Sequence, residues 1–260
     1  WDNDMWAFGE WYFRFPRRSI AVQWFDIEMT VLPNLASVLP VAVPNPERFG
    51  EPAFGYPCRF AGYRRLPGIT ADRMILGRRA RSKVAEDLAL FLYVLHQHGP
   101  AAGRALGAPD DDFRVKFDLA RERSWARLGR LGEVPPRQMS AIQGALDAMP
   151  PDSDCGKCLL HGDLYSRHLL VQADELVGVI DWGDICVGDP AIDLAVVFTL
   201  LEPPARAAFW RQYGRVSAVT RMRARYRALN HTIALLAYAH DTDDRPLYAE
   251  GRRAMNHLLA

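Results

Sequence analysis

The residue pattern of this chain changes once, near residue 65, and that change limits the folds it can adopt. Before it, strand-forming and aromatic residues gather in 5–8 and 11–15, and the two-residue link Gly9-Glu10 predicts a hairpin. Residues 19–35 then place apolar side chains at helical spacing, with Ser19 as the expected N-cap. A further strand over 59–66 completes a small β-rich lobe that contains one helix.

After this change the chain reads mainly as helix. Helices are predicted over the segments 84–98, 113–131 and 137–149, and over nearly all of 189–260. Three short strand-like runs lie among them, at 158–160, 169–172 and 176–180. A length of 260 residues suits one large domain or two lobes that share a cleft. We therefore expect an α+β chain with a lobe at 1–65 and a larger, mainly α lobe at 66–260.

Charge and composition narrow the function classes. The 32 basic and 31 acidic residues leave a net charge of +1, which gives no basic footprint for nucleic acid or for an acidic membrane surface. No apolar run approaches the roughly 20 residues of a membrane helix. The 4 cysteines do not form a disulfide framework. A cytoplasmic protein that acts on a small molecule is expected, and its oligomeric state is not indicated.

The residues that carry chemistry are concentrated in 161–168 and 180–184, on either side of the second and third strand-like runs. A hairpin turn centred on Asp174-Glu175 would place His168 opposite Asp181, about 4.5–5.5 Å apart. Asp163 lies on the short loop that leads into this hairpin. One carboxylate at such a site can hold Mg²⁺, and a second can take a proton from a substrate hydroxyl.

Three motifs in this region, taken in order, resemble those of a known family. They are His161-Gly162-Asp163, Ile180-Asp181-Trp182, and the Gly-Asp-Pro segment 188–195. Together they are similar to the aminoglycoside phosphotransferase and choline-kinase-like family, relatives of protein kinases, over essentially the whole chain. The resemblance implies a two-lobed protein-kinase-like fold, with Asp163 as catalytic base and Asp181 as the Mg²⁺ ligand. It also implies that Asp189 braces the catalytic loop and caps a helix begun by Pro190.

In the small lobe the resemblance assigns the triphosphate contacts. Arg14 takes the position at which protein kinases carry a phosphate-binding lysine, and Glu28 on the following helix is its partner. A guanidinium group can contact phosphate oxygens in two places, and no lysine precedes Lys83 to compete for this role.

The resemblance also places the adenine of ATP and the start of the chain. Residues 60–66 correspond to the hinge, so backbone groups near Gly62 and Tyr63 are expected to meet the base. Residues 1–4 correspond to the end of the nucleotide-covering loop. The first strand of the lobe is therefore expected to lie upstream, and the chain to be truncated at its N-terminus.

His168 departs from the family pattern, which has asparagine at this position. Imidazole is a poor ligand for Mg²⁺. Three roles stay open: His168 binds the metal through water, it orients Asp163 or Asp181, or it marks a weakened second metal site.

These observations predict an ATP- and Mg²⁺-dependent kinase that moves the γ-phosphoryl group to a hydroxyl of a small molecule. An aminoglycoside or macrolide antibiotic, a sugar or an amino alcohol are all open as acceptors, the first two implying antibiotic resistance. The alternative is a catalytically weak or inactive kinase-like module that binds nucleotide or a partner.

Other polar clusters have simpler interpretations. Cys155 and Cys158 lack a second cysteine pair for zinc and do not open a helix as a redox motif does. The alternating arginines of 221–227 indicate a solvated helix surface. The acidic residues of 241–244 favour an exposed loop over a site for a cationic amine.

Overall fold

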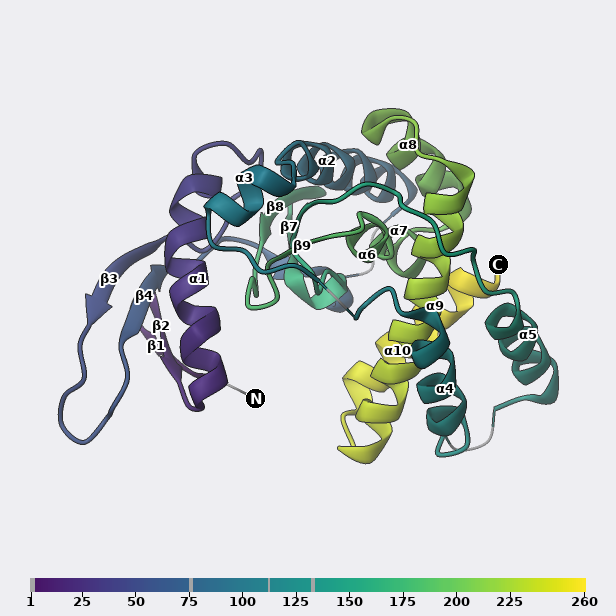
Figure 1. The fold of residues 1–260 in the computed structure, drawn as a ribbon, viewed down its shortest axis with the longest axis horizontal. Helices are drawn as coiled ribbons and strands as arrows, with labels where there is room; N and C mark the ends of the chain where they lie inside the picture. The colour runs from purple at the N-terminus through teal and green to yellow at the C-terminus, as the bar shows by residue number, and fades with distance from the viewer. Residues whose placement is uncertain (1–2, 75–76, 112, 132–133) are drawn as a thin grey trace.

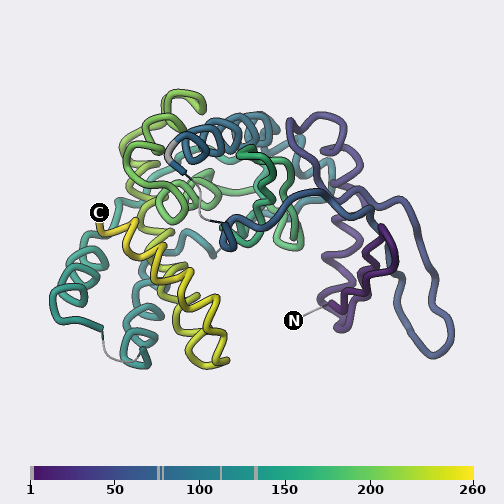
Figure 2. Tube along the Cα trace, turned by 180° about the vertical axis from the view of Figure 1, so that it is seen from behind, coloured from purple at the N-terminus to yellow at the C-terminus, as the bar shows by residue number. Residues whose placement is uncertain are grey.

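The computed structural model describes residues 3–74, 77–111, 113–131 and 134–260. A small antiparallel sheet and one long helix occupy one end of the molecule, and a larger group of helices occupies the other (Figure 1). The view from behind shows the same division, with the N-terminal segment and the C-terminal helix on opposite sides (Figure 2). The two-lobed α+β fold predicted from the sequence is confirmed.

The sheet of the small lobe has four strands in the order β1-β2-β4-β3, and each neighbouring pair is antiparallel. Its strands are β1 (Asn3–Phe8), β2 (Trp11–Pro16), β3 (Pro46–Gly50) and β4 (Phe60–Arg64). The β1–β2 hairpin pairs Phe8 with Trp11, so Gly9-Glu10 forms the turn, and Gly9 has the positive φ of 59° that this turn requires. Strand β3 was not predicted, because prolines surround it in the sequence.

Helix α1 (Ser19–Ala36) packs its apolar residues into the core, where Phe25, Val31 and Leu35 are buried. The expected N-cap is wrong by one position. Arg18 is the N-cap residue, it makes no side-chain capping bond, and Ser19 is the first residue of the helix. The same helix carries one buried acidic residue, Glu28.

Helices form most of the large lobe. They are α2 (Arg78–His96), α3 (Pro100–Ala105), α4 (Phe117–Leu128), α5 (Pro136–Asp147), α6 (Ala191–Leu194), α7 (Val196–Leu200), α8 (Pro203–Tyr213), α9 (Ala218–Asp241) and α10 (Arg245–Leu259). Helix α2 packs on α8, and α9 packs on both α10 and α4. Among the described residues, no helix has the length and apolar character needed to cross a bilayer.

Two small sheets lie within this helical lobe. Strands β5 (Ile69–Thr70), β7 (Leu169–Gln172) and β8 (Glu175–Val179) form one, and β6 (Cys158–Leu160) pairs with β9 (Cys186–Gly188) in the other. The predicted register of the β7–β8 hairpin is wrong. Gln172 pairs with Glu175, so the turn is Ala173-Asp174, and a bulge follows at Leu170/Val171. Both turn residues have positive φ, 49° and 67°, which a two-residue hairpin turn demands.

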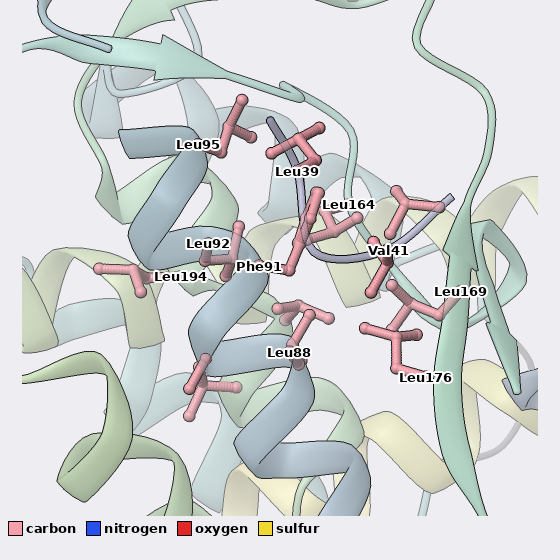
Figure 3. Close-up of a cluster of buried hydrophobic side chains, with 14 of the residues drawn as sticks. Leu39, Val41, Leu88, Phe91, Leu92, Leu95, Leu164, Leu169, Leu176 and Leu194 are labelled. Atoms are coloured by element: carbon pink, nitrogen blue, oxygen red, sulfur yellow. The ribbon is translucent and has the colours of Figure 1, made fainter. Parts of the chain in front are cut away.

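One hydrophobic core runs through both lobes. Leu39 and Val41, which follow α1, belong to the same buried cluster as Leu88 and Leu92 of α2 and Leu169 of β7. Figure 3 shows these side chains meeting between α2 and β7. The backbone adds to this contact, since Ala42 pairs with Gly178 of β8. The strands and helices that carry the motif residues are therefore fixed to a common core.

Candidate active site

The loop that follows β6 carries His161, Gly162 and Asp163. Gly162 has a φ of +88°, and a Cβ atom at this position would lie 2.1 Å from the carbonyl oxygen of Asp184. No side chain fits such an approach, so glycine is required here. The loop therefore lies directly against the segment 181–184, and the two motifs meet in one place.

The buried carboxylate of Asp193 fixes the backbone of this loop. Asp193 is fully buried and accepts hydrogen bonds from the backbone N–H groups of His161 at 2.8 Å and Gly162 at 2.9 Å. The imidazole of His96 lies 3.3 Å from the same carboxylate. Asp193 thus satisfies two buried donors at once, which fixes the loop backbone.

The prediction that Asp189 braces the catalytic loop is wrong. Asp189 accepts a hydrogen bond from Ala191 N at 2.8 Å, at the start of α6, and one from Arg223 Nε at 2.7 Å. Pro190 precedes α6 as its N-cap residue, and Ala191 is the first residue of the helix. The sequence contained the correct residue in the same motif, four positions later, but spacing alone does not tell which aspartate points toward the loop.

His161 connects the loop to the end of β8. Its ring is fully buried, with Nε2 3.0 Å from the carbonyl oxygen of Ile180 and Nδ1 3.3 Å from the backbone N of Asp163. These partners require the proton on Nε2, because a carbonyl only accepts and a backbone N–H only donates. Burial lowers the pKa of His161, so the ring is neutral at pH 7.

His168 brings the two aspartates together. It lies at the end of the short 3-10 helix η2 (Ser166–His168), and its Nδ1 is 2.7 Å from the carbonyl oxygen of Asp163. Its Nε2 is 3.2 Å from Oδ2 of Asp181. His168 and Asp181 therefore lie in contact, as predicted. The hairpin register from which this contact was predicted is wrong.

Both ring nitrogens of His168 have protein partners, so neither is free to ligate a metal in this arrangement. This geometry does not support His168 as a metal ligand and favours the open alternative in which it orients Asp181. Burial opposes a charge on the ring, but the hydrogen bond and charge of Asp181 raise the pKa of His168 overall. Burial likewise acts to raise the pKa of Asp181, and His168 and Arg14 hold it well below its usual range.

Asp181 is presented to solvent at the end of the β7–β8 hairpin. Its side chain is 58% exposed, and its φ of 62° is unusual for a residue other than glycine. In this conformation its carboxylate reaches His168.

Arg14 and Glu28 form an ion pair beside Asp181. Nη1 of Arg14 lies 2.6 and 2.7 Å from the two carboxylate oxygens of Glu28. A Cβ atom at Gly183 would lie 3.2 Å from Arg14 Nη2, 3.3 Å from Glu28 Oε1 and 4.0 Å from Asp181 Oδ1. These three charged groups therefore meet at the backbone of Gly183. Burial raises the pKa of Glu28 to about 7 even with Arg14 beside it.

The structure does not place Gly62 and Tyr63 at a hinge. Both lie inside β4, where Gly62 pairs with Phe13 and Arg48, and Tyr63 pairs with Tyr12 and Pro46. A central strand directs its backbone groups to its neighbours, which leaves them unavailable to a nucleotide base. The hydroxyl of Tyr63 is buried, has no hydrogen-bond partner within the part of the chain that the structure describes, and interacts electrostatically with Glu28 and Arg14. The connection that leaves the sheet begins at Arg65.

The first residues of the chain fall partly outside the described residues, at 1–2. Asn3 and Asp4 belong to strand β1. The amide of Asn3 lies beside Arg14, and with its oxygen turned inward it accepts from Nη2 at 2.8 Å and Nε at 3.1 Å. The guanidinium of Arg14 is therefore held from two sides.

On the other side of Asp163, helix α9 contributes residues that sequence reasoning did not single out as part of the site. His231 Nδ1 lies 3.9 Å from Asp163 Oδ1, and a narrow pocket is lined by Gly162, Asp163, Arg227 and His231. Desolvation acts to raise the pKa of Asp163, but His231, His168 and Arg227 lower it overall, so the carboxylate is charged at neutral pH. The only signal in the sequence was the arginine-rich segment of α9.

Arg114 ties the site to the segment before α4. It contacts Asp111 at 2.8 Å and also contacts Asp184, while Asp111 is itself buried. Asp184 therefore shares Arg114 with Asp111, whereas Asp181 and the Asp163 loop are joined through His168.

The described residues contain no group of three or more His, Cys, Asp or Glu that could enclose a metal ion. Mg²⁺ does not need one, because it binds through one or two carboxylates together with substrate phosphates and water. The exposed carboxylate of Asp181, next to Arg14, has the hard oxygen donors that this ion prefers. The residues present fit a magnesium nucleotide.

A two-lobed fold with paired aspartates at the lobe junction defines a kinase-like phosphotransferase. A model of the phosphotransferase enzyme family APH matches residues 1–229. The chain belongs to this family. No curated protein matches the sequence.

Solved structures share the fold over nearly the whole chain. The GDP and kanamycin complex of APH(2")-IIia matches with a TM-score of 0.74 and 21% identity, covering 99% of this chain and 89% of that one. The ADP-bound aminoglycoside phosphotransferase APH(2'')-Ib matches with a TM-score of 0.61 and 17% identity, covering 99% and 91%. The macrolide 2'-phosphotransferase MphH from Brachybacterium faecium matches with a TM-score of 0.61 and 25% identity, covering 95% and 84%.

Proposed function

We propose that this protein transfers the γ-phosphoryl group of ATP to a hydroxyl group of a small molecule, in a reaction that depends on Mg²⁺. The observation that carries the proposal is the contact of His168 with both the Asp163 loop and the Asp181 carboxylate, 2.7 and 3.2 Å away. Two carboxylates with distinct surroundings are thus held in one site, with Arg14 and Glu28 adjoining.

Asp163 and Asp181 have different surroundings, so we assign them different roles. Asp163 is the carboxylate next to the α9 pocket, and it takes the proton of the acceptor hydroxyl. The hydroxyl oxygen bonds to the γ-phosphorus, the bond from that phosphorus to the β-phosphate bridging oxygen breaks, and ADP leaves with that oxygen. Asp181 holds Mg²⁺, which when bound neutralises charge on the phosphates. Arg14 supplies a further positive charge to the phosphates, and Glu28 fixes its direction.

Two further residues act as positioning residues. His168 orients Asp181 and also holds the carbonyl of Asp163. Asp193 fixes the backbone that carries Asp163. In the nucleotide site, a base would meet the connection after β4, at 65–68, because the strand itself is paired on both sides.

The names of the structural neighbours suggest two acceptor classes. Kanamycin is bound by one neighbour, and another is a macrolide phosphotransferase. Both kinds of antibiotic therefore belong in the first panel of acceptors, together with sugars, amino alcohols and hydroxy acids.

Asp163→Asn and Asp181→Asn test the division of labour. Asp163→Asn is expected to keep the affinity for Mg²⁺-ATP and to lower kcat by about 10²–10⁴-fold, since it removes the proton acceptor. Asp181→Asn is expected to weaken Mg²⁺-ATP binding directly. Titration calorimetry gives the affinities, and ADP release over the acceptor panel gives turnover.

Asp174→Asn is the matched control, because it removes an exposed carboxylate at a turn with φ of 67°, a conformation that asparagine also adopts. It should behave as wild type in both measurements. Equal loss of binding and turnover in both site variants would contradict the proposal. So would Mg²⁺-ATP binding without ADP release for every acceptor, which is the outcome for an inactive nucleotide-binding module.

A further inference from the structure

All three nitrogens of the Arg14 guanidinium already have acceptors on the protein. Nη1 donates to both carboxylate oxygens of Glu28, at 2.6 and 2.7 Å. With the amide oxygen of Asn3 turned inward, this single oxygen accepts from Nη2 at 2.8 Å and from Nε at 3.1 Å. Glu28 thus holds one end of the planar group, and Asn3 occupies the edge formed by Nε and Nη2.

The edge that Asn3 occupies is one that suits a phosphate. Two parallel N–H donors on one edge of a guanidinium match two oxygens of a phosphate or a carboxylate. While Asn3 accepts from both donors and Glu28 accepts from Nη1, a phosphate meets only the remaining N–H of Nη2. The contact in two places that the sequence predicts for Arg14 therefore requires Asn3 to turn away.

Of the two partners of Arg14, Asn3 is the one that is free to leave. Glu28 lies on α1 and is only 2% exposed. Asn3 begins β1, the outer strand of the described sheet, and it is only partly buried. Its partner across the hairpin is Pro16, which has no N–H group to offer the ladder. Turning the Asn3 side chain away therefore breaks two hydrogen bonds and leaves the Glu28 contact intact.

The exchange is favoured at Arg14 because one of its partners is uncharged. Several arginines of the large lobe are bound by carboxylates instead, namely Arg114 by Asp111 and Asp184, Arg167 by Asp72 and Asp244, and Arg223 by Asp189. Arg223 is buried, so the solvated helix surface expected for the arginines of 221–227 is wrong at this position. A phosphate attracts a guanidinium more strongly than a neutral amide does, but a carboxylate already supplies that charge.

We propose that Asn3 controls the affinity of this protein for nucleotide phosphates, because its amide gives up the Nε and Nη2 edge of Arg14 to the phosphate oxygens of ATP or ADP. The inference rests on the proposed phosphotransfer function, which assigns the phosphates to Arg14. Asn3 acts through Arg14, so it is a positioning residue. Its removal should tighten nucleotide binding, which is the opposite of what the removal of a phosphate contact does.

Binding of Mg²⁺-ADP measures the exchange without any turnover. Titration calorimetry compares wild type with Asn3→Ala and Asn3→Asp. Asn3→Ala should bind Mg²⁺-ADP about three- to tenfold more tightly, because no amide competes for the edge. Asn3→Asp should bind it about tenfold or more weakly, because a carboxylate holds Arg14 with charge as well as geometry. Equal or weaker binding by Asn3→Ala overturns the proposal, and so does unchanged binding by Asn3→Asp.

A double-mutant cycle shows whether Asn3 acts through Arg14. In an Arg14→Gln background, Asn3→Ala should leave the affinity for Mg²⁺-ADP unchanged, since the edge for which the amide competes is gone. The same gain in both backgrounds would show that Asn3 acts by another route, and it overturns the proposal.

Two controls separate the phosphate contact from other effects. Adenosine has no phosphate, so the Asn3 variants should bind it as wild type does, and equal effects on adenosine and ADP overturn the proposal. Glu10→Gln removes a carboxylate that is 67% exposed, at the turn of the same hairpin. It should stay within about twofold of wild type, because solvent and salt screen this charge. A change as large as that in Asn3→Asp would make net charge the cause and also overturns the proposal.

Mg²⁺-pyrophosphate, which has no nucleoside, separates this inference from the function on which it rests. Pyrophosphate binding that tightens in Asn3→Ala, with no ADP release from wild type on any acceptor, supports the exchange and contradicts phosphotransfer. ADP release by wild type, with unaltered Mg²⁺-ADP affinity in Asn3→Ala, supports phosphotransfer and contradicts the exchange. Binding of neither ligand by wild type and Asn3→Ala contradicts both.

Discussion

At the scale of single residues, Gly183 is the position where the nucleotide site that we propose depends on the absence of a side chain. Arg14, Glu28 and Asp181 come from a strand, a helix and a hairpin end, and all three lie within 4.0 Å of where its Cβ would be. Glycine lets the ion pair approach the carboxylate of Asp181. The backbone conformation is not the reason, since Gly183 is not among the glycines with positive φ.

Gly183→Ala should therefore raise KM for ATP by about tenfold while leaving the fold intact, because Arg14 and Glu28 must shift by a few tenths of an ångström. Gly144→Ala in α5 is the control, since nothing lies within 4 Å of its Cβ position. That change should leave KM unaltered and stabilise the protein by about 0.5–1 kcal/mol. An unchanged KM in Gly183→Ala would show that the three groups do not act together.

At the scale of structural elements, the catalytic loop depends on α6 more than on its own sequence. Asp193 of α6 supplies both acceptors for the N–H groups of His161 and Gly162. The hydrogen bond and charge of His96, together with the loop, offset burial and lower the pKa of Asp193. The carboxylate therefore contributes stability above its unfolded pKa of about 3.9, and this contribution is lost as the pH falls below that value.

Asp193→Asn should lower the free energy of unfolding by about 1–3 kcal/mol at pH 7, because one buried N–H group loses its acceptor. The difference from wild type should shrink as the pH falls from 5 toward 3. Urea unfolding followed by circular dichroism at each pH measures it. A difference that stays constant over this range would mean that Asp193 is not charged in the folded protein.

At the scale of the whole molecule, the common core determines how the lobes behave. The division into domains 1–65 and 66–260 remains a prediction, and β4 ends at Arg64. The buried cluster that contains Phe25 and Leu35 of α1, however, also contains Leu88 of α2 and Leu169 of β7. The lobes are expected to unfold together.

Leu35→Ala should destabilise the protein by about 2–5 kcal/mol, because this side chain is fully buried in the common core. Unfolding should remain a single transition, with tryptophan fluorescence and circular dichroism changing together. Leu119→Ala, at a position that is 38% exposed on α4, should change the stability by no more than about 0.5 kcal/mol. Two separate transitions would indicate that the small lobe folds by itself.

The sequence by itself determined the elements and the chemical groups of the site. Periodicity predicted the small β-rich lobe, the long helices and the hairpin that ends at Asp181, because it reflects which face of each element is buried. The motifs predicted that Asp163 and Asp181 meet, and the structure brings both to His168.

Only the tertiary structure decided which side chains support these groups. Asp193 rather than Asp189 reaches the catalytic loop, Gly62 and Tyr63 lie inside a paired strand, and Arg227 lies beside Asp163. Each of these facts depends on how far-separated segments pack and in which direction a side chain leaves its helix or strand. The spacing of residues in the sequence does not predict that direction, because contacts across the common core determine where each side chain points.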